Sequence, residues 1–324
     1  MKTALICGIS GQDGAYLADL LIGKGYRVIG SSRDAQTKNF SNLSRLGLVN
    51  KIETCSMALT DFRSVLQTLS QFEPDEIYNL AGQSSVGLSF QQPVETFDSI
   101  TVGTINLLEA IRFLDRPIRL YNAGSSECFG DTGNQAANEN TAFKPRSPYA
   151  TAKSAAHWAV ANYREAYKLY ACTGILFNHE SPLRPKRFVT RKVVLRACEI
   201  ARAGGGTLEL GNIAISRDWG WAPEYVEAMW RMLQLDLPED FVIATGQSNT
   251  LKQFCADAFD AVGLDAGDHI VIRKDLMRPS DIMAGKADPS KAKKTLRWQA
   301  KHTMRDVVRM MIDAELRQMD GASD

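Results

Sequence analysis

Gly8-Ile9-Ser10-Gly11-Gln12-Asp13-Gly14 decides the fold, because its three glycines have the spacing of a phosphate-binding turn. The stretch follows a short apolar run, Thr3–Cys7, and precedes a helical pattern at Tyr16–Gly23. Glycines let such a turn close tightly and let a pyrophosphate approach the backbone, while the helix N-terminus attracts the anion. A glycine pattern alone is a weak signal, and an ordinary glycine turn is the alternative. Between a strand and a helix, it predicts dinucleotide binding by Gly8, Gly11, Gln12, Asp13 and Gly14.

A parallel sheet with crossover helices is predicted by the alternation of short β-rich runs and helical patterns in the first half. The expected strands are Thr3–Cys7, Arg27–Gly30, Lys51–Cys55, Glu76–Leu80, Ile118–Asn122 and Cys172–Phe177. The expected helices are Tyr16–Gly23, Asp61–Gln71, Val102–Phe113 and Pro148–Tyr167. This order is typical of an α/β fold with a doubly wound parallel sheet, the Rossmann arrangement.

The pattern changes after about Phe177, where helices and short strands mix and basic residues become denser. We expect residues 1–177 to form a dinucleotide-binding domain that carries the catalytic residues. Residues 178–324 are expected to form mainly a second, smaller α/β substrate-binding lobe, although the chain can cross back between the lobes. The elements expected there are Val189–Ala203, Thr207–Leu210, Pro223–Gln234, Phe241–Ala244 and Met304–Arg317.

The end of the second strand indicates which dinucleotide fits. An NAD enzyme usually has an acid there to bind the ribose 2′-hydroxyl, whereas NADP needs a cation for its 2′-phosphate. Ser32 stands near the position of the acid, and Arg33 can form a bidentate contact with a phosphate. Two alternatives remain open. A small register shift would bring Asp34 to the ribose, as in an NAD enzyme, and Arg33 can also be a plain surface charge. We predict NADP as the cofactor.

Tyr149 and Lys153 form a Tyr-x-x-x-Lys pair, one helical turn apart and so on one face. A tyrosine with a pKa near 10 is a poor base at neutral pH, and a nearby ammonium together with an oxidised nicotinamide favours the tyrosinate. The lysine can also hold the cofactor ribose. A surface tyrosine and lysine are the alternative, but the glycine turn upstream favours a catalytic pair that also binds the cofactor.

Ser125 and Glu127 follow the fifth expected strand, in Ala123-Gly124-Ser125-Ser126-Glu127. The ends of parallel strands face the cofactor crevice, where a hydroxyl can bind a sugar oxygen. Simple dehydrogenases and epimerases of this kind have no task for the carboxylate, whereas a dehydratase must remove a proton next to a ketone. Glu127 therefore indicates a dehydratase. A solvated loop carboxylate is the alternative.

Composition excludes several other classes of protein. The 324 residues carry 38 basic and 37 acidic side chains, so a net charge of +1 gives no field for nucleic acid or an anionic membrane. The start lacks the features of a signal peptide, and no window approaches a membrane span. Six scattered cysteines without a CxxC pair favour a reducing cytoplasm. The four histidines lack metal-ligand spacing, so no metal site is expected.

The chain resembles the extended short-chain dehydrogenase/reductase family, and within it the 4,6-dehydratases of GDP-linked sugars, almost from end to end. The motifs that carry the resemblance begin at Gly8 (GISGQDGAYL), Tyr78 (YNLAGQS), Pro145 (PRSPY), Gly174 (GILFNHESP), Phe188 (FVTRK), Arg217 (RDWG) and Tyr225 (YVEAMW). The resemblance implies an NADP-dependent dehydration of GDP-mannose to the 4-keto-6-deoxy sugar. A GDP-heptose substrate or a 4-keto-sugar reductase is the nearest alternative, and a noncatalytic dinucleotide-sensing regulator is a remote one.

The resemblance also assigns residues to ligands. It implies that the GDP-sugar is held by Ser84, Asn178, Lys192, Arg217, Arg278 and, at the ribose, Asp281, and that Leu59 and Leu80 contact the cofactor. It further implies a homodimer or homotetramer in which the segment Ser31–Leu46 reaches a neighbour's cofactor. The departures from the family pattern are Ala58, Ser125, Asp281, Met283 and the basic stretch Leu183–Arg187.

Overall fold

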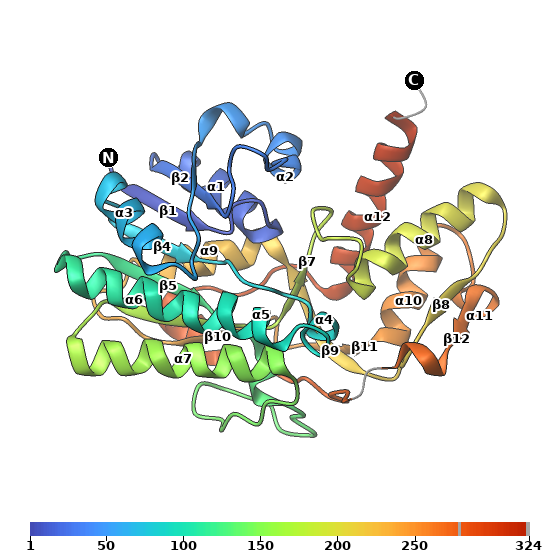
Figure 1. The fold of residues 1–324 in the computed structure, drawn as a ribbon. Coiled ribbons are helices and arrows are strands. Elements are labelled where there is room, and N and C mark those ends of the chain that lie inside the picture. Colours follow the sequence, from blue (N-terminus) through green and yellow to red (C-terminus); the bar gives the residue numbers. More distant parts are fainter. Residues whose placement is uncertain (278–279, 322–324) are drawn as a thin grey trace.

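A seven-stranded, fully parallel sheet forms the core of a computed structural model that describes residues 1–277 and 280–321 (Figure 1). The strand order is β10-β6-β5-β4-β1-β2-β3. The strands are β1 (Thr3–Cys7), β2 (Arg27–Ser32), β3 (Glu53–Ser56), β4 (Glu76–Asn79), β5 (Arg119–Ala123), β6 (Ala171–Leu176) and β10 (Phe241–Ile243). The predicted doubly wound sheet is therefore confirmed.

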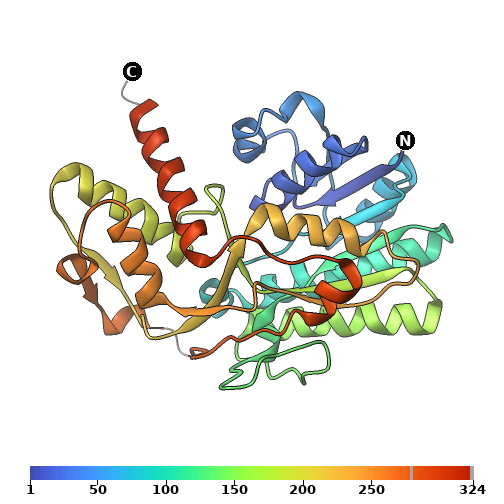
Figure 2. The ribbon, with the colours of Figure 1, turned by 180° about the vertical axis from the view of Figure 1, so that it is seen from behind.

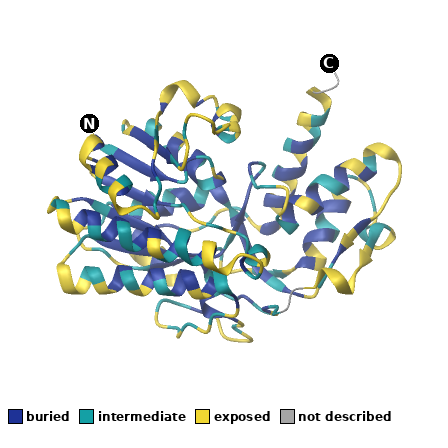
Figure 3. Ribbon diagram, in the orientation of Figure 1, coloured by how far each residue is buried: buried dark blue, intermediate teal, exposed yellow. Residues whose placement is uncertain are grey.

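Helices cover both faces of this sheet, because alternate residues of each strand point to opposite sides. Ala4 and Ile6 pack into the cluster that includes α1 (Gln12–Gly23) and α9 (Ala222–Met232), which Figure 2 shows from behind. Leu5 and Cys7 pack on the other side. The helices of that side are α3 (Phe62–Phe72), α6 (Gly103–Leu114) and α7 (Pro148–Tyr167). The inner strands are buried on both faces, whereas most residues of the edge strand β3 are exposed, and the outer helix surfaces carry many of the other exposed residues (Figure 3).

The start of α7 is fixed by its cap. Ser147 is extended, and its side chain accepts a hydrogen bond from the Ala150 amide at 3.1 Å, while Pro148 supplies a first helical residue that needs no amide donor. Because the helix begins here, Tyr149 and Lys153 lie in its first two turns at the carboxyl edge of the sheet.

The second lobe has its own apolar core. It is built from α8 (Val189–Ala203), α10 (Leu251–Asp260), α11 (Ala266–His269), α12 (Met304–Gly321), β8 (Leu208–Leu210) and β12 (Ile270–Ile272). A three-stranded sheet of β7 (Asn178–Glu180), β9 (Ser216–Trp221) and β11 (Ser248–Thr250) lies between this lobe and the large sheet (Figure 1). Three short helices complete the fold, α2 (Ser41–Arg45), α4 (Val86–Ser89) and α5 (Pro93–Phe97).

The bounds of several elements differ from those expected, and the structure locates the crossing between the two parts that the sequence left open. Helix α1 begins at Gln12 rather than Tyr16, because the helix grows directly out of the glycine turn. Strand β10 and helix α9 belong to the large sheet and its covering layer, so the chain returns from the second part to the first. In the described part of the chain, no helix is both long and apolar enough to cross a bilayer.

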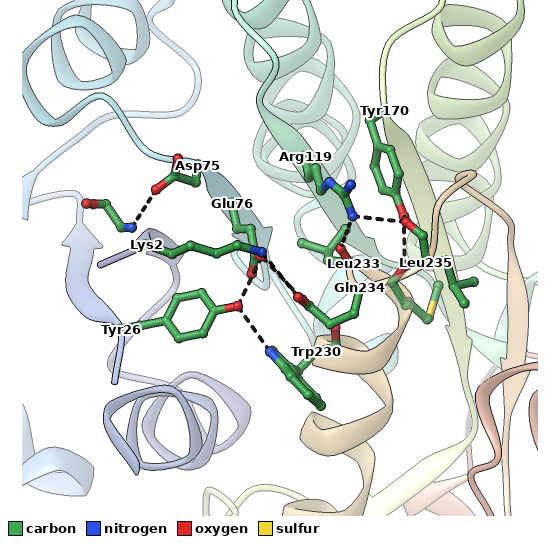
Figure 4. Close-up of polar contacts among 12 residues, drawn as sticks. Lys2, Tyr26, Asp75, Glu76, Arg119, Tyr170, Trp230, Leu233, Gln234 and Leu235 are labelled. Atoms are coloured by element: carbon green, nitrogen blue, oxygen red, sulfur yellow. Dashed lines mark hydrogen bonds and ion pairs between the residues drawn. The ribbon is translucent and has the colours of Figure 1, made fainter. Parts of the chain in front are cut away.

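A polar network closes the amino edge of the large sheet (Figure 4). The buried Glu76 carboxylate accepts from the Lys2 Nζ at 2.8 Å, from the Tyr78 hydroxyl at 2.7 Å, from the Tyr26 hydroxyl at 3.1 Å and from the Gln234 side chain at 3.2 Å. Trp230 Nε1 donates in turn to the Tyr26 hydroxyl. These bonds attach the end of α9 to β1 and β4.

Candidate active site

The glycine turn leaves its helix end open for an anion. Gly8 has φ +86°, and a Cβ there would lie 3.0 Å from the backbone at the end of β4. A Cβ on Gly14 would lie 2.5 Å from the Gly8 carbonyl oxygen. Gly11 is the N-cap of α1 and no side chain caps it, so the first amides of the helix have no partner from that residue. The turn therefore fits a pyrophosphate.

Arg33 and Asp34 differ in what their side chains do at the end of β2. The Asp34 carboxylate accepts from the Gln36 amide at 3.0 Å and from the Thr37 amide and hydroxyl at 3.2 and 2.7 Å. Arg33 is 86% exposed, and its guanidinium lies 3.6 Å from Glu95. Because such an exposed ion pair is weak, the Arg33 side chain can rotate toward a phosphate. The Asp34 carboxylate is already hydrogen-bonded to the residues that follow it.

Ser125 and Glu127 lie just beyond the carboxyl end of β5. Ser125 caps a short 3₁₀-helix, Ser126–Phe129, and its Oγ accepts from the Glu127 amide at 3.3 Å. Ser125 is buried, whereas Glu127 is partly exposed. Within residues 1–277 and 280–321, no hydrogen bond or ion pair of the Glu127 carboxylate is recorded. A carboxylate without protein partners at this edge is available to a substrate.

Tyr149 and Lys153 lie beside Ser125. Burial raises the pKa of Tyr149 above its ordinary value, and the hydrogen bond with Ser125 opposes this rise. The Lys153 Nζ donates to the Ala123 carbonyl at 2.7 Å and lies 5.9 Å from the centre of the Tyr149 ring. Burial lowers the pKa of Lys153 to about 8. Ser125, Tyr149 and Lys153 thus lie together at this edge, and two of the three ammonium protons remain for a ligand.

Leu59 and Leu80 flank the cofactor side of this edge. The Leu80 amide donates to the Cys7 carbonyl at 3.0 Å, which places it directly behind the glycine turn. The Leu59 carbonyl accepts from Asn106 at 2.7 Å, and its side chain packs against Gly103. Both leucines are partly exposed. Ala58, which departs from the family pattern, has its amide bound to Ser64 at 3.0 Å.

Arg217 contacts the segment that follows Asp281, although the two are far apart in sequence. The buried Arg217 donates from Nη1 to the carbonyls of Ser216 at 2.9 Å and Ile282 at 2.8 Å, and Ile282 follows Asp281 directly. Asn178 lies on the neighbouring strand, where it pairs with Trp219. Met283 donates its amide to the Asp131 carboxylate at 2.8 Å.

The other predicted substrate ligands occupy more exposed places. The Lys192 Nζ donates to the Glu209 carbonyl at 2.7 Å. The exposed Ser84 hydroxyl accepts from Arg187 at 3.4 Å, a contact that joins the segment after β4 to the basic stretch before α8. Arg278 lies outside the described residues.

The contacts of His179 and Ser181 with the predicted cofactor residues Asp13 and Gln12 were not predicted from the sequence. Asp13 Oδ2 lies 2.9 Å from His179 Nε2, and Asp13 Oδ1 accepts from the Gln12 side chain at 2.9 Å. The Ser181 hydroxyl donates to Gln12 at 2.7 Å. His179 and Ser181 both lie in a family motif, but 166 residues separate His179 from Asp13, so the motif gives no sign of the pairing.

A family model described as GDP-mannose 4,6 dehydratase matches residues 5–311. The chain is 48% identical to GDP-mannose 4,6 dehydratase 1 of Arabidopsis thaliana, over 97% of this chain and 90% of that protein. It is 40% identical to GDP-mannose 4,6-dehydratase of Vibrio cholerae, over 98% of this chain and 94% of that protein.

This chain belongs to the GDP-mannose 4,6-dehydratase family. The family membership agrees with the predicted resemblance and identifies the chain as a member of an enzyme family. Solved structures agree on the fold. dTDP-glucose 4,6-dehydratase of Bacillus anthracis, solved with NAD, gives a TM-score of 0.86 at 18% identity over 99% of this chain and 98% of that one. UDP-glucose 4-epimerase of Thermus thermophilus, also solved with NAD, gives a TM-score of 0.84 at 23% identity, over 97% of this chain and 99% of that one.

Proposed function

We propose that this family member converts GDP-mannose to GDP-4-keto-6-deoxy-mannose with a bound NADP. The observation that carries the proposal is the Glu127 carboxylate, which has no protein partner among the described residues and lies at the same sheet edge as Ser125 and Tyr149. A reductase or an epimerase on this fold needs the pair but not the carboxylate. The relatives at 40–48% identity carry the name of this dehydratase.

The cofactor assignment has two levels. A nicotinamide dinucleotide is supported by the open glycine turn and by solved structures of the same fold that hold NAD. NADP in particular is supported by Arg33, which can turn toward a 2′-phosphate, and by Asp34, whose carboxylate is occupied within its own turn. A bound nicotinamide would supply the hydride chemistry, a transfer from C4 of the sugar that is later reversed onto C6.

The protein's own part is to move protons and hold the sugar. Tyr149 takes the proton of the 4-hydroxyl, Ser125 orients the 4-oxygen, and Lys153 holds the ribose and favours the tyrosinate. The resulting 4-ketone acidifies the hydrogen on C5, which Glu127 removes. Water leaves from C6 with a proton from the same carboxyl group. C5 then takes a proton from solvent, and Tyr149 releases the proton of the 4-hydroxyl to solvent, which restores both groups. No net oxidation occurs, so the dinucleotide can stay bound between turnovers.

The substrate ligands divide between the two parts of the chain. Residues 1–177 supply the cofactor site and the reacting groups, and residues 178–324 supply most of the GDP-sugar contacts. Arg217, Lys192 and Arg278 are proposed to neutralise the diphosphate, Asp281 to accept from the ribose, and Asn178 and Ser84 to complete the site. A homodimer or homotetramer in the cytoplasm remains a prediction from the sequence.

Product mass tests the proposed reaction. The purified protein is incubated with GDP-mannose and NADP⁺, and the sugar nucleotide is weighed by mass spectrometry. We expect a product lighter than the substrate by one water, without net formation of NADPH. If GDP-mannose stayed unchanged while a GDP-heptose lost water, the substrate would be the GDP-heptose. Stoichiometric consumption of NADPH on a 4-keto sugar would identify a reductase.

A further inference from the structure

Asp13 and His179 join the cofactor turn to the strand that carries a predicted substrate ligand. Asp13 stands in the first turn of α1, and His179 follows Asn178 on β7. The two side chains are 21% and 9% exposed, and 2.9 Å separates Asp13 Oδ2 from His179 Nε2. The imidazole also stacks on the Tyr225 ring at 4.5 Å between centroids, which fixes its plane.

The surroundings of the ring specify its protonation. Nδ1 of His179 lies 2.7 Å from the Phe177 carbonyl, which can only accept, so Nδ1 carries a proton. Nε2 faces the Asp13 carboxylate, so a second proton there completes an imidazolium–carboxylate pair. Burial opposes the charged forms of both groups and is the largest single influence, but the partner's charge and the hydrogen bonds together outweigh it, raising the pKa of His179 and lowering the pKa of Asp13 to about 2.

The position of Asp13 makes its charge a problem for the cofactor. A helix N-terminus stabilises an anion, and the proposed pyrophosphate would occupy this end of α1. An uncompensated carboxylate in the first turn would compete with the phosphates and repel them. We propose that His179 acts as a positioning residue, whose imidazolium neutralises Asp13 and so lets the glycine turn bind an anionic dinucleotide. The inference rests on the proposed cofactor site.

Other titratable and charged groups surround the pair on every side. Arg184, from the segment after β7, lowers the pKa of both His179 and Asp13. The neighbouring groups are Tyr16 on α1, Tyr121 on β5, Lys153 on α7, Glu180 on β7 and Tyr225 on α9. Burial raises the pKa of Tyr16, Tyr121 and Tyr225, so these phenols stay neutral at ordinary pH. Asp13 is therefore the carboxylate in direct contact with the ring.

Dissociation constants for NADP⁺, measured by calorimetry, test the inference through two variants. His179→Asn should weaken binding by about 10-fold or more, the size of one helix-end charge effect in a partly buried site. Adding Asp13→Asn to that variant should recover most of the loss, because the repelling charge is gone. His302→Asn is the matched control, since His302 also pairs with a carboxylate: its Nδ1 lies 2.9 Å from Glu224, which is not part of the glycine turn. It should leave the dissociation constant unchanged.

A purely structural hydrogen bond would give a different result, because the double variant would then bind as weakly as His179→Asn or more weakly. That outcome, or full affinity in His179→Asn, would overturn the inference. A wild-type protein that binds no dinucleotide would instead refute the proposed function.

Histidine ¹⁵N NMR of the wild-type protein gives an independent readout if His179→Asn fails to fold. The signal that disappears in the double variant belongs to His179. We expect both of its nitrogens to be protonated at neutral pH, with NADP⁺ affinity falling as the pH rises through the raised pKa of this ring. A neutral tautomer at neutral pH would contradict the inference.

Discussion

The two edges of the large sheet use buried polar groups in opposite ways. At the amino edge, the Glu76 carboxylate accepts from the Tyr78 hydroxyl and from the side chains of Lys2, Tyr26 and Gln234, which Figure 4 labels. At the carboxyl edge, Lys153 has a single protein acceptor, and the Glu127 carboxylate has no recorded partner in the described part of the chain. A saturated group stabilises the fold, whereas an unsaturated one keeps its bonding capacity for a ligand. We therefore expect substitutions at one edge to change stability and at the other to change rate.

Glu127→Gln should give the largest effect. Loss of the base for the C5 proton should lower product formation by about 10³–10⁴-fold, in the upper range for one acid–base group. The free energy of unfolding should change by less than about 0.5 kcal/mol, as for other partly exposed groups without partners. Product assays and denaturant unfolding measure the two quantities. A large loss of stability would show that Glu127 is structural.

Tyr149→Phe should lower turnover by about 10²–10³-fold, because the 4-hydroxyl loses its proton acceptor. The GDP-sugar should still bind, since the phenyl ring keeps the same shape. Single-turnover kinetics and calorimetry with GDP-mannose distinguish these effects. Normal turnover in this variant would remove Tyr149 from the mechanism.

Glu76→Ala is the counterpart at the amino edge. It leaves the Tyr78 hydroxyl and its neighbours without their acceptor, and should lower the free energy of unfolding by about 2–4 kcal/mol. The turnover number of the folded protein should stay within about twofold of the wild type, because the network is remote from the reacting groups. If the turnover number also fell well below that of the wild type, the amino edge would affect the reaction as well as the stability.

The lowered pKa of Lys153 predicts that both activity and the free energy of unfolding depend on pH. Activity should fall above about pH 8, where the ammonium is lost. Because burial lowers the pKa of the folded state below the unfolded value of 10.5, the unfolded chain binds more protons between these values. The contribution of Lys153 to the free energy of unfolding therefore rises with pH from about 8 to 10.5. Lys153→Met should abolish this slope in pH-dependent unfolding.

Arg33→Ala should give the smallest effect. Loss of one exposed cation should weaken NADP⁺ binding by about 10-fold and leave NAD⁺ binding nearly unchanged. Competition binding with the two dinucleotides measures the ratio. Equal weakening of both would indicate that Arg33 does not contact the 2′-phosphate.

Local patterns predicted the elements that local forces determine. β1 and α7 have the predicted bounds, because an apolar run ends at a glycine in one case and a Ser-Pro cap begins the helix in the other. The return of β10 to the edge of the large sheet was not located, since three buried residues fit either lobe. Long-range packing decides between them.

The candidate site was predictable where motifs are short. Tyr149 and Lys153 lie one turn apart, and Ser125 and Glu127 share one loop, so spacing alone places each pair. The pairing of Asp13 with His179 was not predictable, because the fold and not the spacing brings them together. The same holds for Arg217 and the segment at Asp281.

Single turnover in Glu127→Gln tests most directly whether Glu127 serves the elimination and not the oxidation. The variant is mixed with NADP⁺ and GDP-mannose, and both the absorbance of reduced dinucleotide and the mass of the sugar nucleotide are followed. We predict that reduced dinucleotide accumulates while no water is lost, because C4 oxidation uses Tyr149, Ser125 and Lys153 and does not need Glu127. Formation of the dehydrated product at the wild-type rate would contradict the account.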